Sequence, residues 1–466
     1  MLDAAVAAFQ RILDRNPWTP ELAGILPLSA LIDFIEIPPK LHAFQLVGAA
    51  PLWSWPITPA GSRLLLSDDE ALQQRCFLDR HGNSITLHGL DGLYGAAYVV
   101  ANPETLRLCL SASPPRTIAN LHANMQGDNL RVQRLDVVHV SRLPLARPAP
   151  PSSSSSSWLR FVLLEHWRVY SARYLATAAL GWVVLLAMIV MSAILRTYIA
   201  LAFLVTVPAT GAVLFALYGS SPRRLLVTKS TTVERYNRLI LVAEHMNSTH
   251  WTAFYGESTI LNSLINRPLE PAGLVIAPAA RPVLRACLRV LILGQWAMAL
   301  AAAATKNWNS YFICFWIAFC IFLHAYVITT HRSAEDWMRS CVGLRMQRYR
   351  THLSSRRTLL NTIMALNPAT FPLDLKTGQN DLFCFRKEAL KWINPILEPG
   401  AGRTRWEEAS LKAMREEREQ SPKSPFPSDH WRREYGKDYW NPFILEGIEI
   451  AARIRLEAKL PDEIIH

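Results

Sequence analysis

The sequence predicts an α-helical membrane protein with four transmembrane helices in two hairpins and a small β-rich or mixed N-terminal domain in the cytoplasm. Three observations indicate this fold class: two pairs of long apolar runs, basic residues beside the outer ends of each pair, and short strand-like segments before the first pair. Half of the 466 residues are hydrophobic, and this excess is concentrated in the two pairs of runs.

The four apolar runs are long enough to cross a bilayer. Residues 174–195 and 197–218 form two uncharged runs of 22 residues each, separated by one arginine. A hydrocarbon core needs about 20 residues of helix at about 1.5 Å per residue. Residues 286–304 and 308–330 form the second pair, in which Arg289 can extend to the interface along its aliphatic stem. Two hairpins buried in a large soluble core are the alternative, but soluble helices seldom stay uncharged over such lengths.

The formal net charge of +12 follows from where the basic residues lie. Lys and Arg beside membrane spans are retained on the cytoplasmic side. Both termini and the loop between the hairpins are therefore predicted to be cytoplasmic, with the lipid bilayer rather than nucleic acid as the partner of the basic surface. Spans of this length fit several cellular membranes. The basic residues in question are Arg160, Arg168, Arg173, Arg223, Arg224, Lys229, Arg281, Arg285, Arg289, Arg332, Arg339, Arg345 and Arg348.

The apolar runs and one low-complexity segment divide the chain into six regions. Two prolines followed by six serines form the linker, which cannot bury enough apolar surface to order itself. The regions are a cytoplasmic N-terminal domain (1–147), the Pro/Ser linker (148–157), the first hairpin (158–218), a cytoplasmic helical loop (219–285), the second hairpin (286–330) and a cytoplasmic C-terminal region (331–466).

Short strand-like segments separated by turn residues predict a small sheet in the N-terminal domain. They cover residues 76–79, 84–88, 98–101, 105–110 and 130–139. The seven cysteines have irregular spacings and no CxxC pair, so neither a disulfide framework nor a zinc site is indicated.

Helices are predicted in the loop between the hairpins. Thr231 and Glu234 form a capping box, so a helix is expected to begin there and to continue to about Met246. A second short helix is expected over residues 258–266. The tripeptide that starts at Asn247 has the form of a glycosylation sequon, and on the predicted topology it faces the cytoplasm and stays unmodified.

The C-terminal region is also predicted to be helical. Ser333 caps a helix that is expected to include Leu344 and Tyr349. A charged helix near residues 405–419 and a final helix from about Asn441 follow.

Three segments resemble a known group of proteins. They are GDNLRVQRLDVVHV (127–140), NSTHWTAFYGESTILNSLINRPL (247–269) and SPRRLL (221–226), and they are similar to uncharacterised multi-pass membrane proteins of filamentous fungi. The resemblance runs from about Arg75 to about Arg357 and brings no known activity or catalytic residue with it. Because some such fungal proteins are encoded among secondary-metabolite genes, the resemblance implies an accessory or scaffold role in a fungal metabolic pathway.

A candidate catalytic group lies in the loop between the hairpins. Glu244, His245, His250 and Glu257 are close in sequence, and Ser248 lies among them, so a hydrolase or acid–base site is conceivable. No nucleophile elbow or HExxH motif accompanies them. The alternative is a capped helical hairpin whose aromatic residues Trp251, Phe254 and Tyr255 rest on the membrane interface or pack on the spans.

A second group lies in the fourth span, where Cys320, His324 and His331 share one helix face. Haem or a metal ion would need further ligands on facing helices, and the first three spans contain no histidine. We therefore expect no cofactor and no metal.

Transport would require polar groups inside the spans, and the apolar runs contain no Asp or Glu. Their main polar residues are expected to form hydrogen bonds between helices that approach closely at small residues. The polar residues are Ser192, Thr206, Thr210 and Gln295, and the small ones are Gly181, Gly211, Gly294 and Ala301.

These patterns favour a non-catalytic polytopic membrane protein that positions other membrane or pathway proteins. A membrane-embedded enzyme acting on a lipophilic substrate through the region from Glu244 to Glu257 is the second hypothesis. A transporter or oligomeric channel is the third.

Overall fold

The structure, a computed structural model, describes most of the chain. The described residues are 18–30, 37–48, 51–55, 86–120, 132–143, 172–220, 222–226, 236–271, 279–370, 387–420 and 440–461, with the isolated residues 8, 11, 15, 76, 78 and 79.

Two compact units share the chain, and each is assembled from three separate segments. The helical unit consists of Met1–Asn83, Leu145–Arg224 and Glu270–Val342. The sheet unit consists of Ser84–Pro144, Leu225–Leu269 and Gly343–His466. The linker expected at 148–157 lies outside the described residues.

Four helices of the helical unit are long and apolar enough to cross a membrane, as predicted. Short turns join the first helix to the second and the third to the fourth, and in these turns Arg196 and Lys306 adopt left-handed conformations with φ of 57° and 49°. The side chain of Asn309 accepts a hydrogen bond from the backbone N–H of Ala200 at 3.0 Å, so both turns lie at one end of the unit. The helices are α8 (Ala172–Ile194), α9 (Tyr198–Leu214) with its π-helical continuation η4 (Phe215–Gly219), α11 (Ala280–Thr305) and α12 (Trp308–Tyr326).

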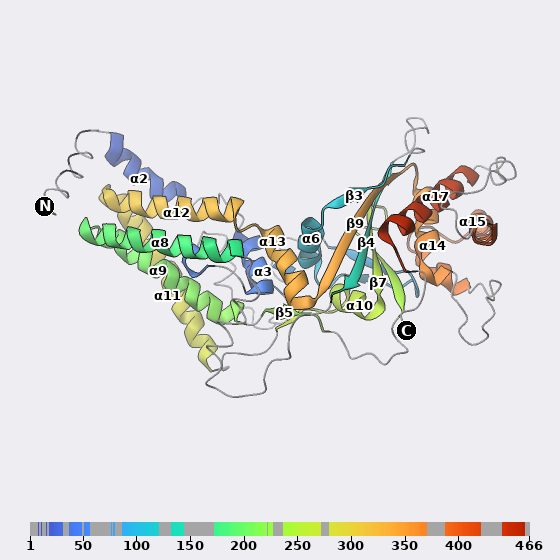
Figure 1. Ribbon diagram of the computed structural model, residues 1–466, viewed down its shortest axis with the longest axis horizontal. Coiled ribbons are helices and arrows are strands. Elements are labelled where there is room, and N and C mark those ends of the chain that lie inside the picture. The colour runs from blue at the N-terminus through green and yellow to red at the C-terminus, as the bar shows by residue number, and fades with distance from the viewer. Residues whose placement is uncertain are drawn as a thin grey trace. The chain divides into compact units, whose positions relative to one another are not determined.

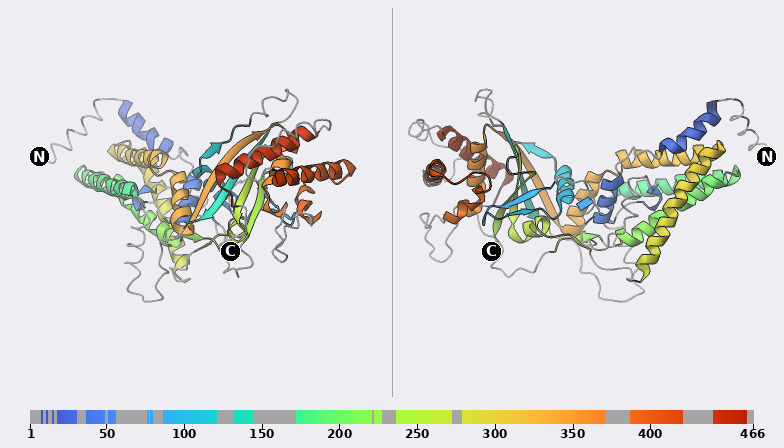
Figure 2. Two further views of the ribbon diagram at one scale, coloured as in Figure 1. Left: turned by 45° about the vertical axis from the view of Figure 1, so that its right-hand side comes forward. Right: turned by 180° about the vertical axis from the view of Figure 1, so that it is seen from behind.

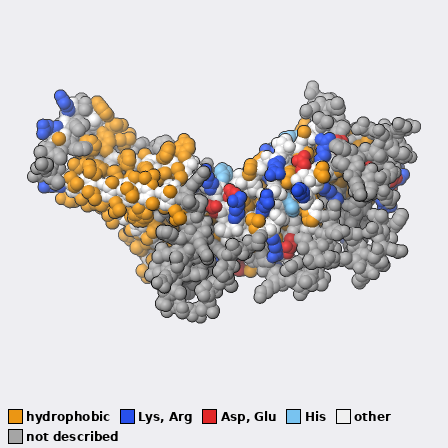
Figure 3. All heavy atoms as spheres, in the orientation of Figure 1, with side chains coloured by type: hydrophobic (Ala, Val, Ile, Leu, Met, Phe, Trp, Pro, Cys, Tyr) orange, Lys and Arg blue, Asp and Glu red, His pale blue; other side chains and the backbone are white. Residues whose placement is uncertain are grey.

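The end of the helical unit that holds these two turns is called the tip end, and the opposite end is called the base end. Between the two ends, large apolar side chains cover the outside of the helices, as Figure 3 shows for one face. Contiguous apolar surface of this extent requires a partner surface or lipid. The exposed side chains include Leu180, Val183, Leu186 and Val190 of α8, Val290 and Leu293 of α11, and Phe315 and Phe322 of α12.

Two N-terminal helices pack at opposite ends of the helical unit. At the tip end, α2 (Trp18–Ala30) packs on α11 and α12, and the hydroxyl of Tyr311 on α12 donates to the carbonyl of Thr19 at 2.7 Å. At the base end, α3 (Ile37–Val47) packs on α13 (Thr330–Asp336), and Lys40 Nζ donates to the carbonyls of His324 at 2.7 Å and Ile328 at 2.8 Å. Thus α2 lies beside α12 at the tip end and α3 lies beside α13 at the base end, as Figures 1 and 2 show.

The chain then turns back into the helical unit at residues 51–55, which include the 3-10 turn η1 (Leu52–Ser54). Trp53 is fully buried, and its indole N–H donates to the carbonyl of Ala178 on α8 at 3.0 Å. Its ring lies against Trp316 and Phe319 of α12, with centroids 5.9 Å away in both pairs. The loop is therefore an internal part of the helix packing.

Two glycines make room for this loop. A Cβ atom at Gly181 would lie 1.9 Å from the ring of Trp53, and one at Gly211 would lie 1.9 Å from the carbonyl oxygen of Leu52. Gly294, in contrast, has nothing within 4 Å of its Cβ position. The expectation that these glycines bring helices together is thus wrong, because two of them receive the loop and the third faces open space.

One expected contact between spans is confirmed. Gln295 of α11 donates through Nε2 to Thr210 Oγ1 of α9 at 2.7 Å. Thr206 does not follow the expectation, because its hydroxyl bonds the carbonyl of Ala202 within its own helix.

A seven-stranded mixed sheet forms the sheet unit, with strand order β2-β1-β6-β7-β4-β9-β3. Strand β4 lies between the central strand β7, with which it pairs in parallel, and β9, with which it pairs antiparallel over ten residues. The strands are β1 (His88–Asp91), β2 (Ala97–Val99), β3 (Pro115–Thr117), β4 (Gln133–Arg142), β6 (Asn237–Ala243), β7 (His250–Glu257) and β9 (Leu344–Leu353). A separate pair, β5 (Arg223–Arg224) and β8 (Glu270–Pro271), belongs to the helical unit.

Helices cover both faces of the seven-stranded sheet (Figure 1). The face called face A carries Leu135, Val137, Trp251 and Tyr255, which form one apolar core with the C-terminal helices. These helices are α14 (Arg356–Leu366), α15 (Ala401–Gln420) and α17 (Asn441–Ala458), with the short η7 (Pro368–Thr370) and η8 (Lys387–Ile393) beside them. The other face, face B, is partly covered by α6 (Pro103–Ala112) and α10 (Ser258–Ile265).

The sheet corrects the predicted fold class, because its strands come from residues 88–353 and not from the N-terminal part alone. Residues 237–243, expected as a helix, form β6, since paired strands on both sides bury this apolar run. Residues 344 and 349, also expected in a helix, belong to β9, and the helix after the fourth span ends with the π-helical η6 (Trp337–Val342).

Conversely, residues 105–110 were expected as a strand but lie in α6, whose first turn holds Pro103 and the acidic Glu104, both suited to a helix start. Residues 78 and 79, expected in a strand, are helical. The strands at 98–101 and 130–139 and the helices at 258–266, 405–419 and from Asn441 are confirmed within a few residues.

Candidate functional site

The structure does not bring the predicted catalytic residues together. Glu244 and His245 lie in the turn after β6, whereas His250 and Glu257 are the first and last residues of β7. An eight-residue strand separates its ends by about 23 Å at about 3.3 Å per residue. Glu257 is buried and accepts hydrogen bonds from Arg142 at 2.8 Å and Thr259 at 2.6 Å. These contacts stabilise the start of α10 and leave Glu257 without access to the two histidines.

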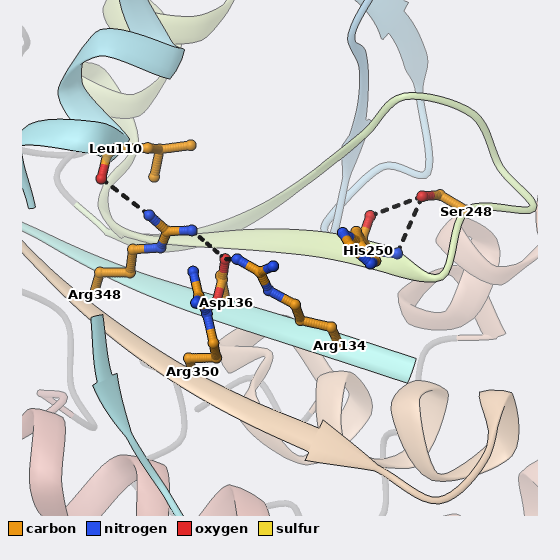
Figure 4. A network of polar contacts seen from close by, with 7 residues as sticks. All are labelled: Leu110, Arg134, Asp136, Ser248, His250, Arg348 and Arg350. Carbon is orange, nitrogen blue, oxygen red and sulfur yellow. Dashed lines mark hydrogen bonds and ion pairs between the residues drawn. The ribbon is translucent and has the colours of Figure 1, made fainter. Parts of the chain in front are cut away.

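The turn between β6 and β7 is built by Ser248. Its hydroxyl donates to the carbonyl of His250 at 3.0 Å and accepts from the N–H of the same residue at 3.1 Å, as Figure 4 shows. A serine nucleophile needs a hydrogen bond to an imidazole nitrogen instead. Because Ser248 bonds the backbone of His250, its geometry is that of a turn residue.

The aromatic residues of β7 belong to the sheet unit and not to the membrane interface. Trp251 and Tyr255 point into the core of face A, and the Tyr255 hydroxyl donates to the carbonyl of Pro461 at 2.7 Å. The fully buried Phe254 lies on face B. The expectation that Trp251 and Tyr255 rest on the membrane interface or on the spans is therefore wrong.

The histidine and cysteine of the fourth span hold the internal loop. His324 Nε2 donates to the carbonyl of Ser54 at 2.8 Å, and Cys320 Sγ lies 3.8 Å from the carbonyl of Trp53. Because Nε2 carries its proton toward Ser54, this nitrogen is not available as a metal ligand in the neutral ring. Residues 51–55 lie some 270 positions away in sequence, so no local pattern could have identified them as the partner.

A second group of potential ligands lies beside α3 in the helical unit. One ligand atom each from His42, Cys76 and Asp79 falls within 4.8 Å of the others. However, His42 Nδ1 accepts the backbone N–H of Leu78 at 3.2 Å, so its proton is on Nε2, which faces Asp79 Oδ2 at 3.9 Å. A metal on Nε2 would displace the proton to Nδ1, directly against the Leu78 N–H. This geometry favours a buried histidine that caps the backbone near Leu78.

A cluster of arginines on face B has the geometry of a binding site. Asp136 of β4 accepts from Arg350 Nε at 2.8 Å and from Arg134 Nη2 at 3.1 Å, and it also accepts from Arg348 Nη2. Arg348 is fixed from its other side, where Nη1 donates to the carbonyl of Leu110 at the end of α6 at 3.0 Å. Figure 4 shows the three guanidinium groups converging on the one carboxylate. We call these four charged residues the arginine cluster.

Alternation along paired strands explains why these side chains meet. Leu135 and Val137 are buried in face A, so Asp136 between them points to face B. The register pairs Asp136 with Arg350 and with Thr252, and this places their side chains on the same face. Charged residues at alternate positions of β4 and β9 were the sequence signal for this site. It was missed because residues 344–349 were assigned to a helix.

The arginine cluster has excess positive charge. Three guanidinium groups against one carboxylate leave a net charge of +2. Burial alone would raise the pKa of Asp136, but the hydrogen bonds from Arg350 and Arg348 and the charges of Arg348 and Arg134 hold it below its usual value. Asp136 therefore stays ionised and orients all three arginines.

Comparison with known proteins gave no match. No family model matches the chain, and neither a curated protein nor a solved structure matches it. Function therefore has to be inferred from the geometry of this chain.

Proposed function

We propose that the chain is a non-catalytic polytopic membrane protein that serves as an accessory or scaffold in a metabolic pathway. Its helical unit is anchored in the bilayer, and its sheet unit is held at the membrane for other membrane or pathway proteins. The observation on which this proposal rests is that the chain's own loop, residues 51–55, fills the interior of the helical unit.

The filled interior argues against transport. Trp53 and Trp55 are almost completely buried, and Trp55 lies 5.0 Å from the ring of Phe44 between centroids. The buried amide of Gln295 is bonded to Thr210, and His324 is bonded to the loop itself. A transporter needs polar groups along a pathway that opens, and such groups are usually ionisable. Here the polar groups hold the packing together, which favours a static anchor.

The exposed surface of the helical unit supports insertion into lipid. The buried share of the spans is only 17–44% by segment, and the side chains that remain exposed are apolar. In water such a surface would aggregate, whereas lipid solvates it. We therefore place α8 with α9 and α11 with α12 in the bilayer as two transmembrane hairpins.

The N-terminal helices revise the proposed topology. Thr19 of α2 contacts the tip end of α12 and Lys40 of α3 contacts its base end, so the two N-terminal helices lie at opposite ends of the same span. Residues before Trp18 then lie on the side of the tips. The chain passes into the sheet unit after β5 and after η6, both at the base end, where Arg223 and Arg339 also lie. The positive-inside rule makes the base end cytoplasmic. In this proposal only the C-terminus and the sheet unit are cytoplasmic.

The enzyme hypothesis has less support than the scaffold hypothesis. Glu257 forms an ion pair with Arg142, and it lies at the opposite end of β7 from His250. A membrane-embedded active site between Glu244 and Glu257 would need these residues to meet within the sheet unit. The transporter hypothesis is disfavoured by the filled interior.

The proposal is tested by complementation: variants are expressed in cells that lack the gene, and recovery of the native phenotype is measured. A triple variant, Glu244→Gln, His245→Gln and His250→Gln, should restore the native phenotype fully, because all three side chains are exposed in the turn after β6 or at the start of β7. Trp53→Ala should fail to restore it, because it removes one of the two buried tryptophans of the internal loop. The reverse result, with an inactive but normally abundant triple variant, would instead support the enzyme hypothesis.

A further inference from the structure

The arginine cluster has N–H donors to which no acceptor among the described residues is bonded. Within the described structure, Arg350 bonds Asp136 only through Nε, and Arg134 bonds it only through Nη2. The Nε atoms of Arg134 and Arg348 are buried and without a hydrogen-bond partner. Burying an N–H without a partner costs about 1–3 kcal/mol, and more when the group is charged. A purely structural ion pair would not need three arginines at this cost.

The Nη groups that Arg134 and Arg350 do not use for Asp136 belong to partly exposed side chains. The side chains of Arg134 and Arg350 remain 28% and 24% exposed, whereas Asp136 is 6% exposed. Arg134 lies on β4 and Arg350 on the adjacent β9, so their remaining N–H groups flank the carboxylate on two sides. Two fixed guanidinium groups thus present donors to one region of face B.

We propose that the arginine cluster is a phosphate-binding site in which Arg134 and Arg350 bind the ligand while Arg348 and Asp136 hold them in place. This site goes beyond the anchoring role proposed above. Planar guanidinium groups match phosphate oxygens in a bidentate manner. The net charge of +2 equals the charge of a phosphate dianion, so the complex would be neutral. Free phosphate and the monoester headgroup of a lipid share this chemistry.

Thermal unfolding and calorimetric titration of the full chain in mild detergent test the site. The probes are inorganic phosphate and short-chain phosphatidic acid, each against sodium chloride of equal ionic strength. We expect saturable binding and a higher melting temperature with at least one probe. Binding of phosphatidic acid alone would identify a lipid headgroup as the source of the phosphate.

Two variants and one control separate recognition from stability. Arg350→Lys keeps the charge but loses the guanidinium fork, and Arg134→Gln changes the most exposed arginine of the cluster. Both should weaken binding at least tenfold. Arg345 lies on β9 like Arg350, but its side chain is on face A. Arg345→Gln is therefore the control and should bind the phosphate probes as the native chain does. Arg350→Lys tests the site even where Arg134→Gln does not fold.

Two results would overturn the proposal. One is that neither probe binds the native chain. The other is that Arg350→Lys binds as tightly as the native chain, because the ligand would then lie elsewhere or recognise charge alone.

Discussion

At the scale of single residues, Asp136 has the largest expected effect on the sheet unit. It is nearly buried and neutralises part of the charge of three arginines on two adjacent interior strands, β4 and β9. Removing one partner of a buried ion pair leaves the other partners unpaired and costs about 3–5 kcal/mol. The arginines are partly exposed, so water offsets a part of this cost.

We predict that Asp136→Asn lowers the free energy of unfolding of the sheet unit by about 3 kcal/mol at neutral pH. The pKa of Asp136 is held below its usual value in the folded chain, so its stabilising effect is present at neutral pH. That effect is lost as the pH falls through the folded pKa of Asp136. The difference between the native chain and the variant should therefore vanish in acid. Chemical unfolding at several pH values measures it, with the exposed Glu244→Gln as a control of small effect. A difference independent of pH would contradict this account.

At the scale of elements, the internal loop depends on two glycines. Because a methyl group at Gly211 would meet the backbone of Leu52, Gly211→Ala should displace the loop and lower the amount of folded, monodisperse protein several-fold. Gly294→Ala is the matched control in another span, where a methyl group meets nothing. Size-exclusion chromatography of detergent extracts compares the two. Equal yields of both variants would show that the loop does not occupy this place.

The end of α17 provides an opposite test, because a substitution there should stabilise the sheet unit. Lys459 ends this helix in a left-handed backbone conformation with φ of 47°. Residues other than glycine adopt this conformation at a cost of about 1 kcal/mol. Lys459→Gly should raise the free energy of unfolding by about 0.5 kcal/mol after the greater flexibility of glycine in the unfolded chain is subtracted. Thermal unfolding measures the change, and a lower melting temperature would contradict it.

Elements with a strong local signal could be predicted from sequence, and elements defined by distant partners could not. The four apolar helices and α17 are recognisable from composition and periodicity alone. The run at residues 237–243 is apolar in either a helix or a strand, and only its pairing with β1 and β7 decides for the strand. The arginine cluster requires β4 and β9 to pair across some two hundred residues, and no pattern within either strand specifies that register.

At the scale of the whole molecule, topology is the feature with the widest consequences. Residues 18–47 were not recognised as part of the helical unit because Glu21, Asp33, Glu36 and Lys40 interrupt their apolar character. The structure places two of these charges at the ends of α12, where Glu21 pairs with Lys306 and Lys40 bonds terminal carbonyls. After Glu21, α2 carries no charged residue, so this helix can pack beside α12 within a bilayer.

Attachment of glycans in a membrane-insertion assay tests this topology most directly. An acceptor tripeptide Asn-Ser-Thr added before Met1 should be modified, because the N-terminus is proposed to lie on the side of the tips. The natural sequon at Asn247 should stay bare although Asn247 is exposed in its turn, because the sheet unit is proposed to be cytoplasmic. The same tripeptide added after His466 is the matched control and should also stay bare. An unmodified N-terminal acceptor, or a mobility shift abolished by Asn247→Gln, would contradict the proposed arrangement in the membrane.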